Sequence, residues 1–268
     1  MSNIAKTFNE LRSSGRKGFI PFVTAGDPDL PTSLSIILKL AELGADVIEL
    51  GVPFSDPMAD GPTIQRSSQR SLEGGTTLQD VLDLVKNFRS RSTVPLVLFS
   101  YLNPVLRFGV ERFGQEVQKA GIDGVLFTDV IEDEAAALSK SFAEYEIDLI
   151  SLIAPTTTDE RLGTICATAR GFIYAVSRAG VTGAQASTSD AAEALVDRSR
   201  KFTDLPIAVG FGISTSEQIS DVWRYADAAV VGSAIVAAIE KQPQNAVAAV
   251  DSFVRTLLPP FANGGLET

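Results

Sequence analysis

The stretch ELGVPFSDPMADGPTIQ (49–65) carries two carboxylates, Glu49 and Asp60, in settings of very different polarity. Glu49 interrupts an apolar run, DVIELGV (46–52), of the kind that forms a buried strand. Burying a carboxylate is costly unless the fold or the chemistry uses it, and desolvation raises its pKa. A carboxylic acid with a raised pKa can donate and accept a proton near neutral pH. Glu49 is therefore predicted to be either an acid–base group or one partner of a structural ion pair.

Asp60 and Asp56 have simpler local interpretations, whereas Asp129 does not. Asp60 precedes Gly-Pro, where a helix can begin, so on local grounds it is a helix cap or a turn residue. Asp56 is followed by proline, which favours a turn. Asp129 ends the run GVLFTDV (124–130), where it could act directly or hold the loop that follows Glu49. The other ionisable groups at predicted strand ends are Tyr101, Tyr174 and Arg178.

The residue types that are missing exclude several mechanisms. The chain has no histidine, which rules out Ser-His-Asp and Cys-His nucleophile systems and histidine-ligated zinc or iron sites. Its single cysteine, Cys166, excludes an internal disulfide, fits a reducing compartment and is predicted to pack in a helix. No lysine lies in the predicted strands, which disfavours a Schiff-base aldolase. Acid–base chemistry must then fall to carboxylates, tyrosine or lysine.

Composition narrows the classes of partner. The 268 residues carry a net charge of −10, which disfavours nucleic acid and anionic membrane surfaces. With 45% apolar residues, the chain can bury a sizeable core. The N-terminal segment has no signal-peptide core, and no apolar run is long enough to span a membrane. We therefore expect a cytoplasmic location.

Short apolar runs alternate with segments of helical periodicity, and Thr77 with Asp80 resembles a capping box at one helix start. Eight strand–helix units favour a (β/α)8 TIM barrel, about 250 residues long in typical cases, over a doubly wound sheet with fewer strands. No linker divides the chain, so residues 1–268 are expected to form a single domain, with an extra N-terminal helix over residues 2–14. The predicted strands cover residues 18–26, 46–52, 94–102, 124–130, 147–155, 172–177, 206–212 and 228–234.

Glycines after the last two predicted strands suggest an anion site. Gly210 and Gly212 lie at the turn after the seventh strand, and Gly232 and Ser233 open a short helix after the eighth. Backbone amides approach an anion closely at glycine, and helix N-termini favour negative charge. In (β/α)8 barrels this is a frequent place for a phosphate. The alternative is that these glycines only permit tight turns.

The stretch RAGVTGAQASTSD (178–190) is long, small and polar for a strand–helix connection. It is predicted to be a mobile lid over the same end of the barrel. Its Gly183 would add a further backbone amide to the anion site.

Several motifs resemble those of the tryptophan synthase alpha subunit. ELGVPFSDPMADGPTIQ is the most specific of them, whereas the glycine turns alone would not identify a family. The others are PFVTAGDPD, FSYLNPVLRFG, LIAPTTTDERL, GFIYAVSRAGVTGA, IAVGFGIST and VVGSAIV, and together they cover essentially the whole chain. The resemblance implies a (β/α)8 barrel that cleaves indole-3-glycerol phosphate to indole and glyceraldehyde 3-phosphate by a reverse-aldol reaction.

The resemblance also implies roles for individual residues. Glu49 matches the acid–base catalyst, and Asp60 matches the carboxylate that binds the indole N–H and stabilises positive charge developing on the ring nitrogen. Phe22 matches a residue lining the indole pocket, and Tyr174 an active-site tyrosine. Thr182 matches a lid residue that meets Asp60 on closure. The residues that match the phosphate site are Gly183, Gly210, Gly212, Gly232 and Ser233.

By the same resemblance, the partner is a beta subunit that carries pyridoxal phosphate, in an alpha2beta2 complex that passes indole through a tunnel. The alpha chain itself is expected to bind no cofactor and no metal. The loop over residues 53–60 and the lid would carry communication between the subunits. Two places depart from the family pattern. Met58 replaces a usual leucine, a volume-conserving change expected to be harmless, and Ile131 with Glu132 replaces a frequent proline in a loop near the partner.

Three alternatives are open from the sequence. One is another phosphate-binding barrel enzyme, an isomerase or lyase of a phosphorylated sugar, although indole-glycerol-phosphate synthase fits poorly because it relies on a strand lysine. The second is a regulatory subunit with little activity, against which Glu49 and Asp60 argue. The third is a free-standing lyase that produces indole without a partner.

Overall fold

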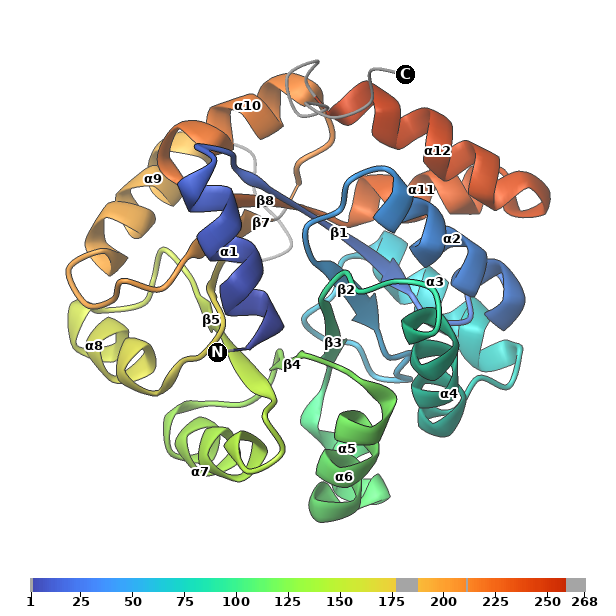
Figure 1. Ribbon diagram of the computed structural model, residues 1–268, viewed down its shortest axis with the longest axis horizontal. Coiled ribbons are helices and arrows are strands. Elements are labelled where there is room, and N and C mark those ends of the chain that lie inside the picture. The colour runs from blue at the N-terminus through green and yellow to red at the C-terminus, as the bar shows by residue number, and fades with distance from the viewer. Residues whose placement is uncertain (1, 177–187, 211, 259–268) are drawn as a thin grey trace.

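Eight parallel strands close into a barrel in which each strand pairs with its neighbours in sequence and β8 pairs with β1 (Figure 1). The computed structural model describes residues 2–176, 188–210 and 212–258. The (β/α)8 prediction is confirmed, and each strand is shorter than the apolar run that predicted it. The strands are β1 (Gly18–Thr24), β2 (Ile48–Gly51), β3 (Leu96–Ser100), β4 (Gly124–Phe127), β5 (Asp148–Ile153), β6 (Ile173–Val176), β7 (Ile207–Gly210) and β8 (Ala228–Val231).

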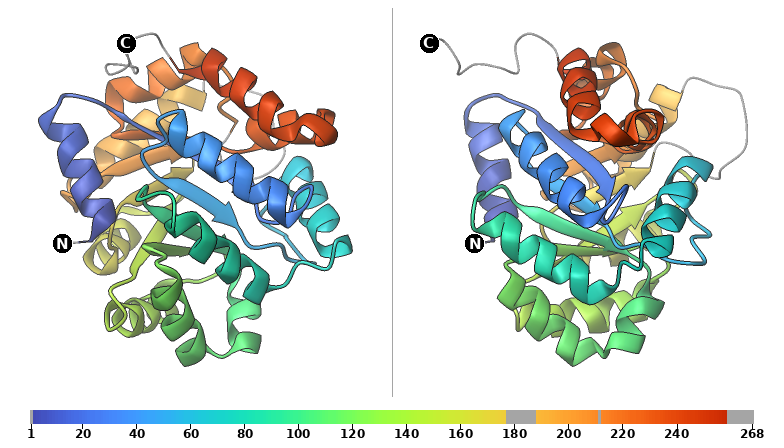
Figure 2. Two further views of the ribbon diagram at one scale, coloured as in Figure 1. Left: turned by 45° about the vertical axis from the view of Figure 1, so that its right-hand side comes forward. Right: turned by 90° about the vertical axis from the view of Figure 1, so that its right-hand side faces the viewer.

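Helices cover the outside of the barrel in both side views (Figure 2). None of the described helices is long and apolar enough to cross a membrane. Two connections hold a pair of helices, because α3 and α4 lie between β2 and β3, and α5 and α6 between β3 and β4. The helices are α1 (Asn3–Ser13), α2 (Leu30–Glu42), α3 (Pro62–Glu73), α4 (Leu78–Arg89), α5 (Leu102–Phe108), α6 (Val110–Ala120), α7 (Glu132–Ala143), α8 (Asp159–Thr168), α9 (Thr188–Ser199), α10 (Ser216–Tyr225), α11 (Ser233–Lys241) and α12 (Ala246–Leu257).

The core consists of two shells separated by the strands. Side chains that face the barrel interior, such as Val47 just before β2, form one buried cluster. Their sequence neighbours Ile48 and Leu50 face the helices and join a second, larger cluster. Cys166 packs in that outer cluster, as predicted. Since side chains alternate along a strand, Glu49 must share the inner face with Val47.

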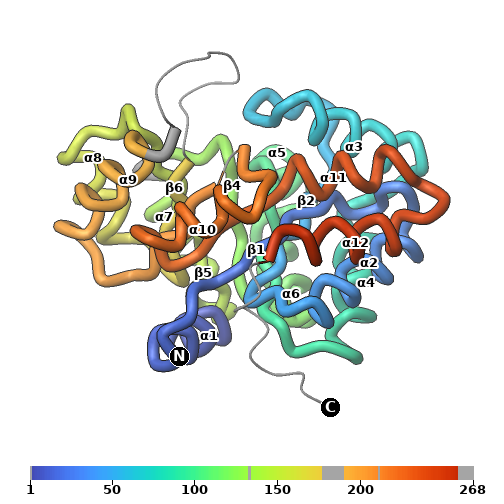
Figure 3. The backbone as a smooth tube through the Cα atoms, turned by 90° about the horizontal axis from the view of Figure 1, so that it is seen from above, coloured from blue at the N-terminus to red at the C-terminus, as the bar shows by residue number. Residues whose placement is uncertain are grey.

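Helix α1 closes one end of the barrel, which confirms the predicted N-terminal helix. Its residues Ile4, Phe8 and Leu11 belong to the inner cluster, and the Phe8 ring lies 5.7 Å from that of Phe172 between centroids. Figure 3 shows α1 on the side of the barrel opposite α3. Helix α1 therefore fills the interior of the barrel from one end.

The two helices between β2 and β3 are built in different ways. Helix α4 begins with the predicted capping box of Thr77 and Asp80. Helix α3 begins at Pro62 with Gly61 as its N-cap, and Gly61 provides no side-chain cap. The first-turn amides of α3 are thus left without a side-chain partner at the open end of the barrel.

Candidate active site

A cavity of about 150 Å³ lies at the carboxyl ends of the strands and contains both carboxylates of the 49–65 stretch. Of the site residues that the family resemblance implied, all those that the structure describes line it except Gly210. The lining residues are Phe22, Glu49, Ala59, Asp60, Gly61, Ile64, Phe99, Thr128, Leu152, Tyr174, Val176, Gly212, Val230, Gly232 and Ser233.

A larger hollow of about 300 Å³ lies between strands β4 and β5 and helices α7 and α8. Arg161 is the only charged residue among its described lining residues. A hollow without an acid or a base cannot move a proton by side-chain chemistry. The smaller cavity is therefore the candidate active site, on chemical grounds and not on volume.

Glu49 lies on β2 between Phe22 of β1 and Val97 of β3 in the sheet register. Its side chain is fully buried, and within the described part of the chain neither carboxylate oxygen has a hydrogen-bond partner. Desolvation raises the pKa of Glu49 to about 8. No described residue supports the alternative of a structural ion pair. At neutral pH Glu49 is a protonated acid facing a cavity.

Phe22 forms an aromatic wall beside this acid. Its ring meets that of Phe99 edge-on, with centroids 5.3 Å apart and planes at 77°. Glycine is needed at position 51, because a Cβ there would lie 2.6 Å from the Phe22 Cζ. Both rings line the same cavity as Glu49 and give it an apolar wall.

The N-cap of α3 is Gly61 and not Asp60, so the capping interpretation is wrong. The alternative of a turn residue is confirmed, because the Asp60 N–H donates to the Pro57 carbonyl at 3.1 Å. Burial raises the pKa of Asp60 to about 6, and a hydrogen bond with Tyr101 opposes the rise. At pH 7 Asp60 is therefore mostly ionised while Glu49 is mostly protonated. The two acids differ because one faces the barrel interior and the other lies on a connection.

Tyr101, a minor candidate from the sequence, holds the Asp60 connection. Its hydroxyl accepts a hydrogen bond from the Ala59 N–H at 2.9 Å, and its ring lies 5.0 Å from that of Phe54. Burial, together with the charge of Asp60, raises the pKa of Tyr101 to about 12, so it remains a proton donor at working pH. Its place at the end of β3 was the sequence signal for this role.

Tyr174 of β6 is buried, with 8% of its surface exposed, and lines the cavity. Burial raises its pKa well above the usual value, and the nearby carboxylates of Glu49 and Asp60 add to the shift. A Cβ at position 210 would collide with the Tyr174 hydroxyl and would lie 2.9 Å from the Val230 Cβ. Gly210 is thus explained by the packing of Tyr174, and it does not line the cavity.

The cavity is also lined by Gly212, Gly232 and Ser233. Gly212 has φ +79°, a conformation that favours glycine. Gly232 is the N-cap of α11 and provides no side-chain cap, so the first-turn amides of this helix are left for another partner. A helix N-terminus with free amides attracts an anion.

Several predicted residues lie elsewhere. The carboxylate of Asp129 accepts a hydrogen bond from the Leu102 N–H at 2.8 Å, so it fixes the start of α5 and does not hold the loop after Glu49. Asp56 accepts from the Ser55 hydroxyl at 2.6 Å, as in a local turn. Arg178, Thr182 and Gly183 lie outside the described residues.

Several cavity residues have no recognisable signal in the sequence. Thr128 follows β4, and its buried hydroxyl has no hydrogen-bond partner among the described residues. Ile64 lies on the first turn of α3, where the sequence has no apolar run that would indicate a buried residue.

In the described part of the chain, no group of three or more Cys, Asp and Glu residues is arranged to hold a metal ion.

A closed (β/α)8 barrel with paired acids and free amides at its open end defines a TIM-barrel enzyme. Residues 8–258 match the model of one such family, "Tryptophan synthase alpha chain". The chain belongs to this family, whose members are lyases of tryptophan biosynthesis.

Relatives and solved structures agree with this assignment. The alpha chain of Acidiphilium cryptum is 51% identical over 237 residues, which cover 88% of this chain and 86% of that one. The alpha chain of Neisseria gonorrhoeae is 46% identical over 258 residues, covering 96% and 98% of the two chains. The crystal structure of the alpha subunit from Legionella pneumophila superposes with a TM-score of 0.88 at 34% identity, covering 96% of this chain and 97% of that one.

Replacing Glu49 with glutamine should remove a pH dependence of stability. The unfolded chain loses this proton near pH 4.5, whereas the folded chain keeps it until about pH 8. The contribution to the free energy of unfolding is therefore complete below pH 4.5 and is lost as the pH rises toward 8, by roughly 3–5 kcal/mol in total. Urea titrations between pH 6.5 and 8, where Asp60 is already mostly ionised, measure the slope.

The matched control is Glu10→Gln, which removes an exposed acid from α1 and should keep the wild-type slope. An unchanged slope in Glu49→Gln would show that the carboxyl is solvated or paired in solution.

Proposed function

We propose that the chain cleaves indole-3-glycerol phosphate to indole and glyceraldehyde 3-phosphate with its own carboxyl groups. One observation carries the proposal: a single cavity holds two acids whose pKa values lie on opposite sides of neutral, about 8 for Glu49 and about 6 for Asp60. Membership of the family supports the substrate. The difference between the two pKa values supports the division of labour.

Glu49 can serve both proton transfers of the reverse-aldol step. Its carboxylic acid donates a proton to indole C3, the bond between C3 and the glycerol carbon breaks, and that carbon becomes the carbonyl of the aldehyde product. The Glu49 carboxylate formed in this way accepts the proton of the adjacent hydroxyl and returns to its starting state. The absence of a described hydrogen-bond partner leaves both oxygens free for this exchange.

Asp60 stabilises the charge that develops on the ring. Protonation at C3 makes the indole nitrogen positive, and an ionised carboxylate that accepts its N–H offsets this charge in a water-poor site. Tyr101 holds the connection through Ala59, so the carboxylate is oriented before substrate binds. Phe22 and Phe99 provide the apolar surface against which a bicyclic ring can pack.

The phosphate would bind at Gly212, Gly232 and Ser233, with Gly183 as a further donor suggested by the family resemblance. The chain itself would need no metal and no cofactor, because carboxyls supply every proton transfer in this scheme. Pyridoxal phosphate belongs, on this proposal, to the partner subunit.

Glu49→Gln should lower kcat by at least ~100-fold with KM nearly unchanged, since the amide cannot transfer the proton.

In the wild type, kcat/KM should rise as the pH passes about 6, where Asp60 ionises, and fall through about 8, where Glu49 loses its proton. In Asp60→Asn, the rise near pH 6 should disappear from this profile, and the fall near pH 8 should remain. Indole release assays measure both effects, with Glu10→Gln as control, and wild-type turnover in Glu49→Gln would refute the assignment.

Ser233→Asp should raise KM by at least ~10-fold because it places a negative charge where the phosphate would bind. An acidic residue in the first turn is favourable for the helix itself, so α11 should stay folded. Ser233→Ala, which keeps the backbone amides, is the matched control and should change KM much less. Equal KM values for the two variants would remove the start of α11 from the substrate site.

We further propose that the chain assembles with a tryptophan synthase beta subunit into an alpha2beta2 complex, in the cytoplasm. The connection before α3 supports a docking surface, because Met58 is 87% exposed and Leu72 of α3 is 36% exposed beside the same groove. Ile131, which departs from the family pattern, is 64% exposed. Solvent-facing apolar side chains of this size favour burial by a partner.

Indole formation should increase when the cognate beta chain is added, and Met58→Glu should weaken that binding about tenfold or more. Phe202→Glu changes another partly exposed apolar residue, 39% exposed and away from the groove, and should bind as the wild type does. Stimulation that is identical in all three proteins would place the partner elsewhere, and no stimulation at all would favour a free-standing lyase.

A further inference from the structure

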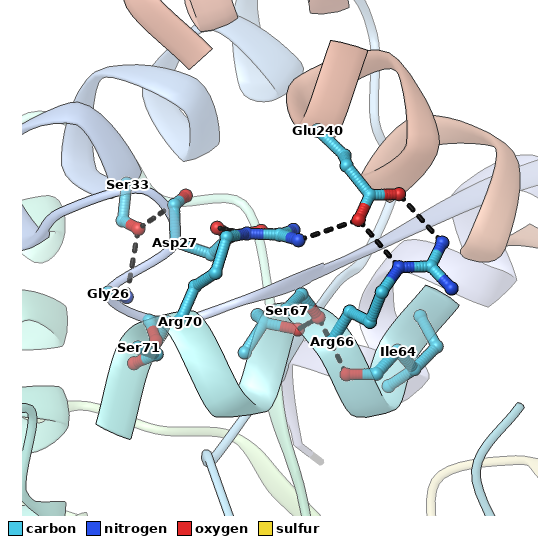
Figure 4. Close-up of polar contacts among 11 residues, drawn as sticks. Gly26, Asp27, Ser33, Ile64, Arg66, Ser67, Arg70, Ser71 and Glu240 are labelled. Atoms are coloured by element: carbon cyan, nitrogen blue, oxygen red, sulfur yellow. Dashed lines mark hydrogen bonds and ion pairs between the residues drawn. The ribbon is translucent and has the colours of Figure 1, made fainter. Parts of the chain in front are cut away.

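Four charged side chains join the two helices that begin at the cavity (Figure 4). Arg70 donates from Nε and Nη2 to the two oxygens of Asp27, both at 2.8 Å, and from Nη1 to Glu240 at 2.8 Å. Arg66 donates from Nε and Nη2 to the two oxygens of Glu240, at 2.7 and 2.8 Å. Two-pronged contacts of arginine with carboxylate are strong and directional.

The network joins the two helices whose first turns border the candidate active site. Arg66 and Arg70 lie on α3, which follows directly on the cavity residues Asp60 and Gly61. Glu240 lies in the last turn of α11, whose first residue, Ser233, also lines the cavity. In Figure 4 the Glu240 carboxylate points from α11 toward both arginines. Glu240 is thus the direct ionic link between the two helices.

Helix α3 depends on such contacts because it buries little apolar surface. Its buried residues are Ile64 and three serines, whereas every buried residue of α4 is apolar. The Ser71 hydroxyl donates to the Ala25 carbonyl at 2.6 Å, and Ser67 shares a hydrogen bond of 2.6 Å with Thr24. Hydrophobic burial is not directional, so it cannot by itself fix the position of a helix. Hydrogen bonds and ion pairs are directional, and they set the position of α3.

Glu240 can be replaced without leaving a buried charge unpaired, because its side chain is partly exposed. The Asp27 side chain is 1% exposed, so removing Arg70 would leave a buried charge without its partner and threaten the fold. The Glu240 side chain is 27% exposed, and its loss leaves Arg70 paired with Asp27 and leaves Arg66, 51% exposed, in contact with water. The hydrogen bonds from Arg66 lower the pKa of Glu240 to about 2, so the link is ionised at every working pH.

We propose that Glu240 is a positioning residue, which fixes the start of α11 relative to the start of α3 and so sets the span between Asp60 and the amides at Ser233. This inference rests on the proposed function, in which one substrate must contact Asp60 and the amides at Ser233 at the same time. Glu49 lies on a strand outside the network. Loss of Glu240 should therefore affect substrate binding more than the proton transfer.

Glu240→Ala should raise KM for indole-3-glycerol phosphate about tenfold while kcat falls less than about threefold, because a shift of about 1 Å in a binding group can cost this much or more. Glu240→Gln, which keeps the shape and one acceptor oxygen, should lie between this variant and the wild type. The matched control is Asp251→Ala, which removes a two-pronged pair with Arg255, at 3.1 Å for each contact, that lies within α12 alone. This control should leave KM unchanged.

Hydrogen exchange provides a readout that needs no substrate. In Glu240→Ala, the hydrogen-bonded amides of residues 65–69 and 236–240 should exchange faster, while those of α4 should not change. Unaltered KM and exchange in Glu240→Ala, or an equal rise in KM in Asp251→Ala, would overturn the proposal. A wild-type chain that cleaves no substrate would refute the proposed function instead, and the exchange result would still decide the role of Glu240.

Discussion

The desolvation of one carboxyl group is the constraint on which the site depends. The pKa of Glu49 rises to about 8 only because the barrel removes water from it and, among the described residues, offers no partner. Three features exclude water from this group. Helix α1 fills the far end of the barrel, the Phe22–Phe99 pair lines the cavity, and Gly51 makes room for the Phe22 ring. A single cation or ordered donor beside the group would favour its ionised form and remove the acid.

Such a group can be tolerated because the two-shell core is large. The outer cluster packs every strand against helices, and the inner cluster closes the interior below the acid. A buried acid that keeps its proton costs far less than a buried charge, since the neutral form is only weakly solvated in water. The barrel therefore accepts Glu49 as a neutral group, and its reactivity and its cost to stability have the same physical origin.

Much of this was predictable from the sequence, for identifiable reasons. Apolar runs showed all eight strands, and alternation placed Glu49 on the inner face, because both features depend on local pattern. The place of Asp60 in the cavity was not predictable from its neighbours, since Gly-Pro signals a helix start whether or not the preceding acid caps it. Gly210 was assigned to anion binding, whereas its lack of a side chain accommodates Tyr174 from a neighbouring strand. Contacts between distant segments leave no local signal, and the link from Glu240 to α3 is a further example.

The lining of the proposed phosphate site indicates why its placement would matter. None of the described residues that line the cavity is a lysine or an arginine. Arg66 and Arg70 lie nearby, but Asp27 and Glu240 neutralise them, and the whole chain carries a net charge of −10. An anion at this end would be attracted by backbone amides and the dipole of α11, whose effect falls off within the first turn. A lysine could follow a displaced phosphate on its flexible stem, whereas amides fixed in a helix cannot. Recognition by amides would therefore require that the helix itself be held in place, and the proposed role of Glu240 meets that requirement.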